Sequence, residues 1–335
     1  MVRTYIRSIQ FILLFFFPIV LSSQSPSYWK DAASSEFKAP QKERQSIPET
    51  YRTLSFDVDV FLTVCESASD RFSENKGIAP VIVMPMPNGV DESFRLENAE
   101  LMHPELANRF PELKNYVGVG IEDPTSVIRI SYSPYLGLHG MIRSTSHSAV
   151  FIDPVTQDNE HYISYYRKDL SAPQMPFECY TEEEAEGKMI LEEKSQLPGP
   201  LGDCNLRRYR LAQSCNGEYA QYHIGQAGGT TGSTAGDKAI VQAAMDVTMN
   251  RVNGVYELDF GITMQFVANN DEVIYLDAAT DPWTGEFNTT TAQTLDAVIG
   301  VNNYDIGHNF NTSGGGNAGC IDCVCEAVSQ SGTHK

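Results

Sequence analysis

The sequence predicts an α+β protein, in which an antiparallel β-rich region over residues 51–180 precedes an α/β region over residues 203–335 with a mixed sheet and helices. Two patterns lead to this prediction. The first region holds short apolar segments separated by Gly, Pro, Asn and Asp, as in antiparallel β domains. The second region alternates strand-like segments with segments of helical period, which indicates α/β structure.

The β-rich region opens with strict alternation of apolar and polar residues over 54–60, which a half-buried strand requires. Strands are expected at 81–86 and 93–96, on either side of the turn signal Pro87-Asn88-Gly89. A short helix is expected at 103–110. Further strands are expected at 127–133, 137–144, 148–155 and 161–168.

The α/β region is built around one long predicted helix, 237–258, whose apolar residues share a face. That face comprises Val241, Ala244, Met245, Thr248, Val252 and Val255. A strand at 208–215 and a Gly- and Thr-rich loop at 225–236 precede the helix. A strand at 262–268, prolonged by 273–276, a second helix at 290–299 and a strand at 304–310 follow it.

The N-terminus has the pattern of a signal peptide over residues 1–24. Arg3 and Arg7 precede the apolar run 11–21, which is too short to span a bilayer comfortably and is interrupted by Pro18. We therefore expect a secreted, extracellular protein; an uncleaved membrane anchor is the alternative. Residues 25–50 are polar and are expected to form a mobile lead-in. The Glu-rich segment 181–202 is expected to be an acidic linker, of the kind that proteases cut.

Charge and cysteine content limit the partners and the compartment. A formal net charge of −19 argues against nucleic acid and against membrane surfaces as partners once the signal peptide is removed. Export permits disulfides, and an odd number of cysteines leaves at least one thiol free, metal-bound or paired outside the chain. The seven cysteines are Cys65, Cys179, Cys204, Cys215, Cys320, Cys323 and Cys325.

Sequence signatures of a complete hydrolytic site are missing. The C-x-x-C-x-C spacing that begins at Cys320 is not that of a structural zinc site, so disulfides are the better interpretation there. The sequence holds neither G-x-S-x-G nor H-E-x-x-H. The seven histidines are His103, His139, His147, His161, His223, His308 and His334.

Several segments of the α/β region resemble the opening of the catalytic domain of bacterial secreted reprolysin-like zinc metallopeptidases, which belong to the metzincin clan. They are LRRYRLA at 206–212, NGEY at 216–219, MNRVNGVYE at 249–257, FVANN at 266–270, NYDIGH at 303–308 and GGGNAG at 314–319. The β-rich region resembles the prodomain of the same family at 84–89, 104–107 and 120–125.

The resemblance implies a secreted zinc-dependent endopeptidase precursor, of which this chain is the signal peptide, the prodomain and an incomplete catalytic domain. The family's zinc helix, H-E-x-x-H-x-x-G-x-x-H, would come a few dozen residues after Cys325 and lies outside this sequence. No catalytic residue is therefore assigned, and the 335-residue chain is expected to be inactive on its protein or peptide substrates. The alternative is a non-catalytic secreted β-rich binding or inhibitory protein.

The resemblance also implies a substrate-binding strand. In the family, the strand after the glycine-rich segment forms the upper rim of the cleft, and here it corresponds to residues 316–324. Gly316, Ala318, Gly319 and Cys320 would then pair with an extended peptide, because an exposed strand edge offers unpaired N–H and C=O groups.

Two further ligand roles follow from the family. Metzincin prodomains often carry a cysteine whose thiolate caps the zinc, which makes Cys179 a cysteine-switch metal ligand. The alternative is a disulfide between Cys179 and Cys65, Cys204 or Cys215. Asp305 fits one position of the calcium site of some relatives, but the first-strand glutamate is not found at 209–212, which argues against calcium.

Overall fold

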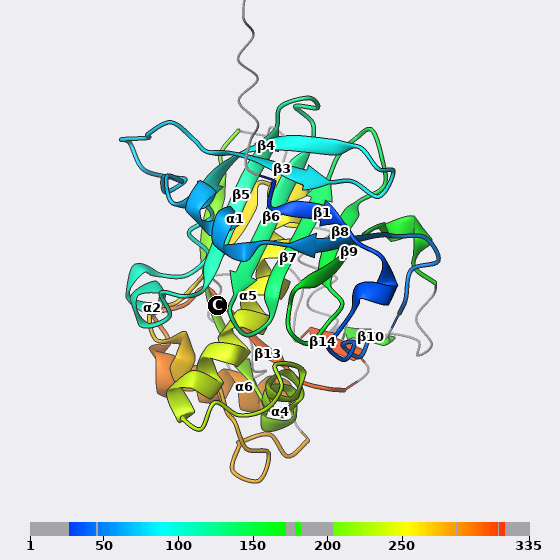
Figure 1. Ribbon diagram of the computed structural model, residues 1–335. Coiled ribbons are helices and arrows are strands. Elements are labelled where there is room, and N and C mark those ends of the chain that lie inside the picture. Colours follow the sequence, from blue (N-terminus) through cyan, green and yellow to red (C-terminus); the bar gives the residue numbers. More distant parts are fainter. Residues whose placement is uncertain are drawn as a thin grey trace, which may run out of the picture.

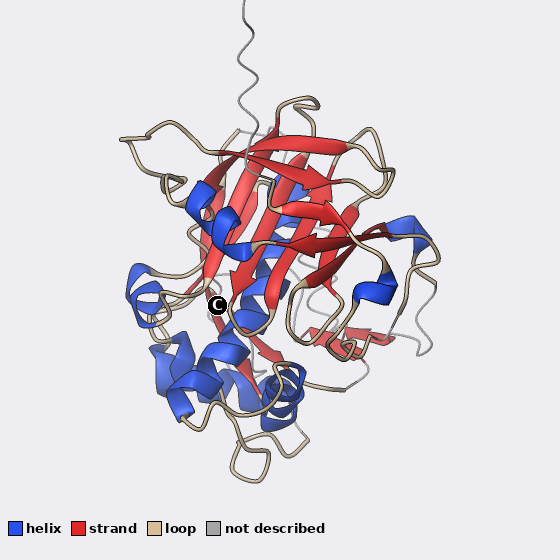
Figure 2. Ribbon diagram, in the orientation of Figure 1, coloured by secondary structure: helices blue, strands red, loops and turns tan. Residues whose placement is uncertain are grey.

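The computed structural model describes residues 27–44, 46–171, 178–181, 204–285, 287–313 and 315–318, and for 178–181 it describes the backbone alone. Residues 27–171 form a unit based on one large sheet, here called the sheet unit, and residues 204–318 form the α/β unit below it (Figures 1 and 2). The predicted signal peptide and nearly all of the predicted acidic linker lie outside the described residues. No helix within the described ranges is long and apolar enough to cross a membrane.

The sheet unit is a nine-stranded antiparallel sheet with the order β1-β2-β9-β8-β7-β6-β5-β4-β3. The sheet curls so that its two ends approach each other, since Ser164 on β9 donates a hydrogen bond of 2.7 Å to the carbonyl of Pro85 at the end of β3. The strands are β1 (Trp29–Asp31), β2 (Arg52–Phe56), β3 (Val81–Pro85), β4 (Asp91–Asn98), β5 (Lys114–Gly120), β6 (Val127–Ser133), β7 (Gly137–Arg143), β8 (Val150–Pro154) and β9 (His161–Tyr166).

The strands expected at 81–86, 93–96, 127–133, 137–144, 148–155 and 161–168 are confirmed. The strand expected at 54–60 is wrong beyond Phe56. Asp57 instead caps helix α1 (Val58–Cys65) by accepting a hydrogen bond from the amide of Val60. The helix buries Phe61 against the concave face of the sheet, and that burial outweighs the local alternation.

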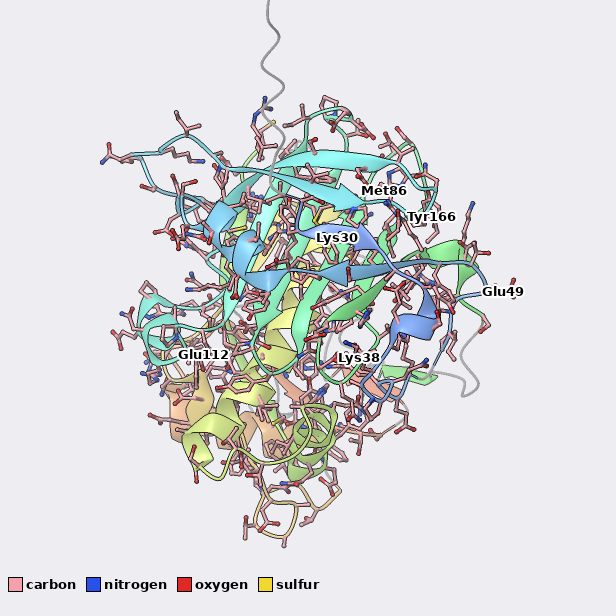
Figure 3. The ribbon with its side chains drawn as sticks, in the orientation of Figure 1. Lys30, Lys38, Glu49, Met86, Glu112 and Tyr166 are labelled. Carbon is pink, nitrogen blue, oxygen red and sulfur yellow. The ribbon has the colours of Figure 1, made fainter. Side chains whose placement is uncertain are left out.

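The segment expected to be a mobile lead-in, 25–50, contributes a strand and a buried side chain in its described part. Tyr28 is 4% exposed and belongs to the core of the sheet unit, and β1 adds to the edge of the sheet beside β2. Lys30 on β1 is exposed, as are Lys38 and Glu49 in the rest of the segment (Figure 3). Burial of aromatic side chains thus fixes the beginning of this segment.

The α/β unit contains a three-stranded parallel sheet with the order β12-β11-β13. The expected strands 208–215, 262–268 and 304–310 and the two expected helices are confirmed, with shifted ends. The segment expected at 273–276 does not prolong β12, because the 3₁₀ helix η3 (Asn270–Val273) intervenes; Ile274 instead forms an isolated parallel bridge with Cys215. The elements are β11 (Arg207–Cys215), α4 (Gly217–Gln226), α5 (Thr234–Phe260), β12 (Ile262–Phe266), α6 (Phe287–Leu295), a π-helical turn η4 (Asp296–Gly300), β13 (Ile306–Phe310) and β14 (Gly315–Ala318).

Helix α5 lies between the two sheets and contacts β6 and β7 of the sheet unit as well as β12 (Figure 2). It begins at the N-cap Ser233 and ends at Gly261, whose φ of 65° is the left-handed conformation that glycine adopts readily. The predicted apolar face is buried at Val241 and Met245. The opposite face, however, is not exposed to solvent.

A ladder of polar side chains runs along that opposite face of α5. Its members are at most 2% exposed: Gln242, Asp246, Asn250 and Asn253. The Asp246 carboxylate accepts a hydrogen bond of 2.6 Å from Asn115 on β5, and the Asn250 amide donates one of 2.9 Å to the carbonyl of Ile130 on β6. The sheet unit thus supplies partners to Asp246 and Asn250, whereas Gln242 and Asn253 are hydrogen-bonded within the α/β unit.

The buried carboxyl of Asp246 predicts a pH-dependent stability. Burial raises its pKa to about 7, although hydrogen bonds from Gln242 and Asn115 act in the opposite direction. Because the folded state holds the proton more tightly, this stabilisation is complete below the unfolded pKa of about 4 and is lost as the pH rises towards 7. In the wild type, the free energy of unfolding in urea should fall by about a few kcal/mol over this pH range. Asp246→Asn, which stays neutral, should not show this fall. A wild-type-minus-variant difference that is constant between pH 4 and 7.5 would contradict the assignment.

Candidate functional site

The predicted substrate-binding strand is paired with another segment of the same chain. Strand β14 (Gly315–Ala318) lies parallel to β10 (Glu178–Thr181), and the two form a two-stranded sheet (Figure 1). In this register Cys179 is opposite Gly316. Two of the residues that sequence analysis singles out, far apart in the chain, are thus brought together. Ala318 is opposite Thr181, whereas Gly319 and Cys320 lie outside the described residues.

The β10–β14 pair occupies the backbone groups that an incoming peptide would use on this edge. A strand that adds to a sheet binds through main-chain N–H and C=O groups. A peptide that pairs with Gly315–Ala318 on the same edge must therefore displace β10. The assignment of β14 as the substrate strand stays a prediction, and the pairing gives a physical reason why access to it is restricted.

The cysteines of the described core are not disulfide partners of Cys179. Cys65 and Cys215 are buried free thiols, and Cys204 is an exposed free thiol. Burial raises the pKa of both Cys65 and Cys215 to about 12, which keeps them as unreactive thiols. The alternative pairing of Cys179 with one of these three is therefore not found.

Asp305, the candidate calcium ligand, is instead engaged by an arginine of the neighbouring strand. Its carboxylate accepts a hydrogen bond of 2.6 Å from the Nη2 of Arg210 and one of 2.7 Å from the Arg210 amide. Burial alone would raise the pKa of Asp305, but the hydrogen bonds from Arg210 outweigh it and lower the pKa. A guanidinium thus stands where a cation would need to approach Asp305.

His308 on β13 is hydrogen-bonded to the neighbouring strand β11. Its ring lies in a polar cluster between β11 and β13, with its Nδ1 3.2 Å from the side-chain nitrogen of Gln213. The cysteines from Cys320 onwards, with which His308 could share a metal, lie outside the described residues.

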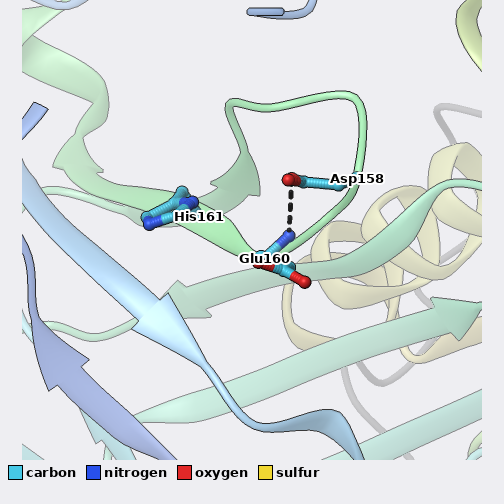
Figure 4. A group of neighbouring side chains, drawn as sticks. All are labelled: Asp158, Glu160 and His161. Carbon is cyan, nitrogen blue, oxygen red and sulfur yellow. Dashed lines mark hydrogen bonds between the residues drawn. The ribbon is translucent and has the colours of Figure 1, made fainter. Parts of the chain in front are cut away.

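Within the described ranges, one group of three side chains has metal-ligand chemistry: Asp158, Glu160 and His161, at the turn between β8 and β9 (Figure 4). One ligand atom from each lies within 4.8 Å of the others. Asp158 already accepts hydrogen bonds from the Thr156 hydroxyl and from the Glu160 amide. The group belongs to the sheet unit and offers one imidazole, so it does not match a site with three histidines such as the family's zinc helix supplies.

Comparison with known proteins gives one family match, which falls on the α/β unit. Residues 210–334 match the family described as Metallo-peptidase family M12B Reprolysin-like. Metallopeptidases of this family are normally zinc-dependent and act on proteins or peptides. No curated protein matches the chain. The match begins in β11 and extends through the remaining elements of the α/β unit, so it supports the resemblance inferred for that region.

The Arg210–Asp305 pair predicts that calcium has no stabilising effect. Only a ligand that binds the folded state raises the melting temperature. The carboxylate of Asp305 is already paired with the guanidinium of Arg210. The melting temperature in millimolar calcium chloride should therefore equal the melting temperature in an excess of chelator. As a control, Arg210→Gln should lower the free energy of unfolding by at most about 1 kcal/mol, because the pair is partly exposed. A chelator-reversible rise in melting temperature would show that a calcium site exists.

Proposed function

We propose that this chain is the precursor of a secreted zinc-dependent endopeptidase, in which the sheet unit is the prodomain and the α/β unit is the first half of the catalytic domain. The family match over residues 210–334 is the observation that carries the proposal. The parallel order β12-β11-β13, with the long helix α5 packed on it, agrees with the α/β sheet expected for such a domain. Secretion is proposed from the basic and apolar pattern of residues 1–24.

The zinc site itself is proposed to lie outside these 335 residues. The sequence has no H-E-x-x-H, and the described group at Asp158 does not fit the family's ligand set. No step of peptide hydrolysis is therefore assigned to a residue of this chain. What the chain contributes is the strand β14, whose edge would hold the substrate extended, and the segment that covers it.

Latency is proposed to come from β10. Its parallel pairing with β14 covers one edge of the strand proposed to bind substrate, and its register has the backbone of Cys179 opposite Gly316. A cysteine held at that edge has the right chemistry to cap a zinc ion as a thiolate. Steric occupation and metal capping would thus act through the same four-residue strand.

The reading frame after Lys335 gives the first test. An open frame that encodes H-E-x-x-H supports the peptidase, and the product should cleave a protein substrate in a zinc-dependent way. A stop codon directly after Lys335 would favour the non-catalytic secreted binding or inhibitory protein instead. In either case the 335-residue chain is expected to show no peptidase activity, and robust zinc-dependent cleavage by this chain would contradict the proposal.

Replacement of Cys179 tests latency in the product that carries the zinc helix. Cys179→Ala should raise basal activity before activation by at least roughly tenfold, which corresponds to about 1.4 kcal/mol of lost inhibition. Cys204→Ala is the matched control, because Cys204 is an exposed free cysteine outside the β10–β14 pair. Equal basal activity in the wild type and in both variants would rule out the capping role.

A further inference from the structure

The contact between the sheet unit and the α/β unit, here called the junction, has an apolar part. A single cluster of buried side chains contains Leu106, Phe110 and Leu113 from the sheet unit together with Ile240 and Met245 from α5. Leu106 is fully buried in this cluster. Separation of the two units would expose these side chains to water, which is unfavourable in proportion to the apolar area.

The junction also includes paired backbone. The amide of Phe266, at the end of β12, donates a hydrogen bond of 2.9 Å to the carbonyl of Leu101, and the amide of His103 donates one of 2.9 Å to the carbonyl of Phe266. Met102 and Phe266 form a parallel bridge. The sheet unit thus pairs with the end of β12, where Phe266 would otherwise present an unpaired N–H and C=O.

A buried ionic cluster lies at the C-terminal half of α5. The carboxylate of Glu257 contacts the guanidinium groups of both Arg129 and Arg71, the latter at 2.7 Å. The side chains of Arg129 and Glu257 are 2% and 7% exposed. One helical turn and a half earlier, Arg251 of α5 pairs with Asp153 of β8 at 2.6 Å. Buried pairs of this kind are screened little by salt, and loss of one partner leaves the other charge buried and unpaired.

We infer that the sheet unit stays bound to the α/β unit after the connecting chain is cut, so that its departure is a separate step from cleavage. Apolar, backbone and ionic contacts all cross the junction, and none of them involves the connecting segment. Cleavage removes only the covalent connection, which favours association by raising the effective concentration of one unit near the other. The inference takes from the proposed function only the idea that the connecting segment is cut.

The test uses the full chain with a site-specific protease sequence inserted between Gly199 and Pro200. After complete cutting, size-exclusion chromatography at micromolar concentration should give one species that contains both parts, also in high salt. Dilution series then give the apparent dissociation constant. Glu257→Gln should raise it by roughly 30-fold or more, because two arginines lose their carboxylate.

Glu272→Gln is the matched control, since Glu272 is an exposed glutamate of the same unit, and it should leave the constant unchanged. Uncut variants are compared by circular dichroism and thermal melting. If Glu257→Gln fails to fold, Arg71→Gln tests the same carboxylate from its partly exposed side. Separation of the wild-type parts after cutting overturns the inference, as does an unchanged constant in the tested junction variant. Because elution does not depend on peptidase activity, the two proposals fail separately: zinc-dependent cleavage by this chain contradicts only the proposed function, and separation of the cut parts contradicts only the inference.

Discussion

Helix α5 is buried on every side over residues 239–246, and the arrangement of both units depends on this. One side packs on the three-stranded parallel sheet through residues such as Val241, and the other side lies on β6 and β7 of the sheet unit. A helix buried on two sides cannot be released from either sheet without exposing a face that has lost its partners. The same helix therefore links the stability of the α/β unit to the presence of the sheet unit.

The sheet unit also covers strand edges of the α/β unit. Residues 101–103 pair with the end of β12, and β10, which follows the sheet unit in the chain, pairs with β14. Exposed strand edges bind other extended segments, which is useful in a peptidase cleft and hazardous in a precursor. The two pairings thus have different consequences in the proposed enzyme, since one completes the fold and the other closes the predicted substrate edge.

Local patterns in the sequence predict the strands of the sheet unit well. The segments at 127–133 and 161–168 became β6 and β9, in which most residues of both faces are buried. Strand β5 was not predicted, since Gly118 and Gly120 interrupt the alternation. These glycines are required by packing: a Cβ on Gly118 would lie 2.6 Å from Leu96 and one on Gly120 would lie 2.3 Å from the carbonyl of Asp123.

The non-local features were beyond the reach of sequence patterns. Gln242, Asp246 and Asn250 at intervals of four residues look like a solvent-facing stripe, and their partners Asn115 and Ile130 lie more than a hundred residues earlier. The pairing of Cys179 with Gly316 likewise joins segments that no local period connects. The family resemblance did indicate both residues, but separately: Gly316 as part of the substrate-binding strand and Cys179 as the cysteine switch.

The mixed chemistry of the junction bears on how the two units come together. A core that forms once and never opens needs no polar ladder, because apolar side chains of similar volume are at least as stabilising. Side chains such as Asn250 and Glu257 can be satisfied either by water or by the sheet unit, so α5 can be hydrated on this face before docking and desolvated afterwards. The apolar cluster around Leu106 then provides the affinity, while the ladder and the ionic cluster select one register of α5 against the sheet. A junction of this composition suits two units that associate with each other, and the order of events in activation follows from how strongly they do so.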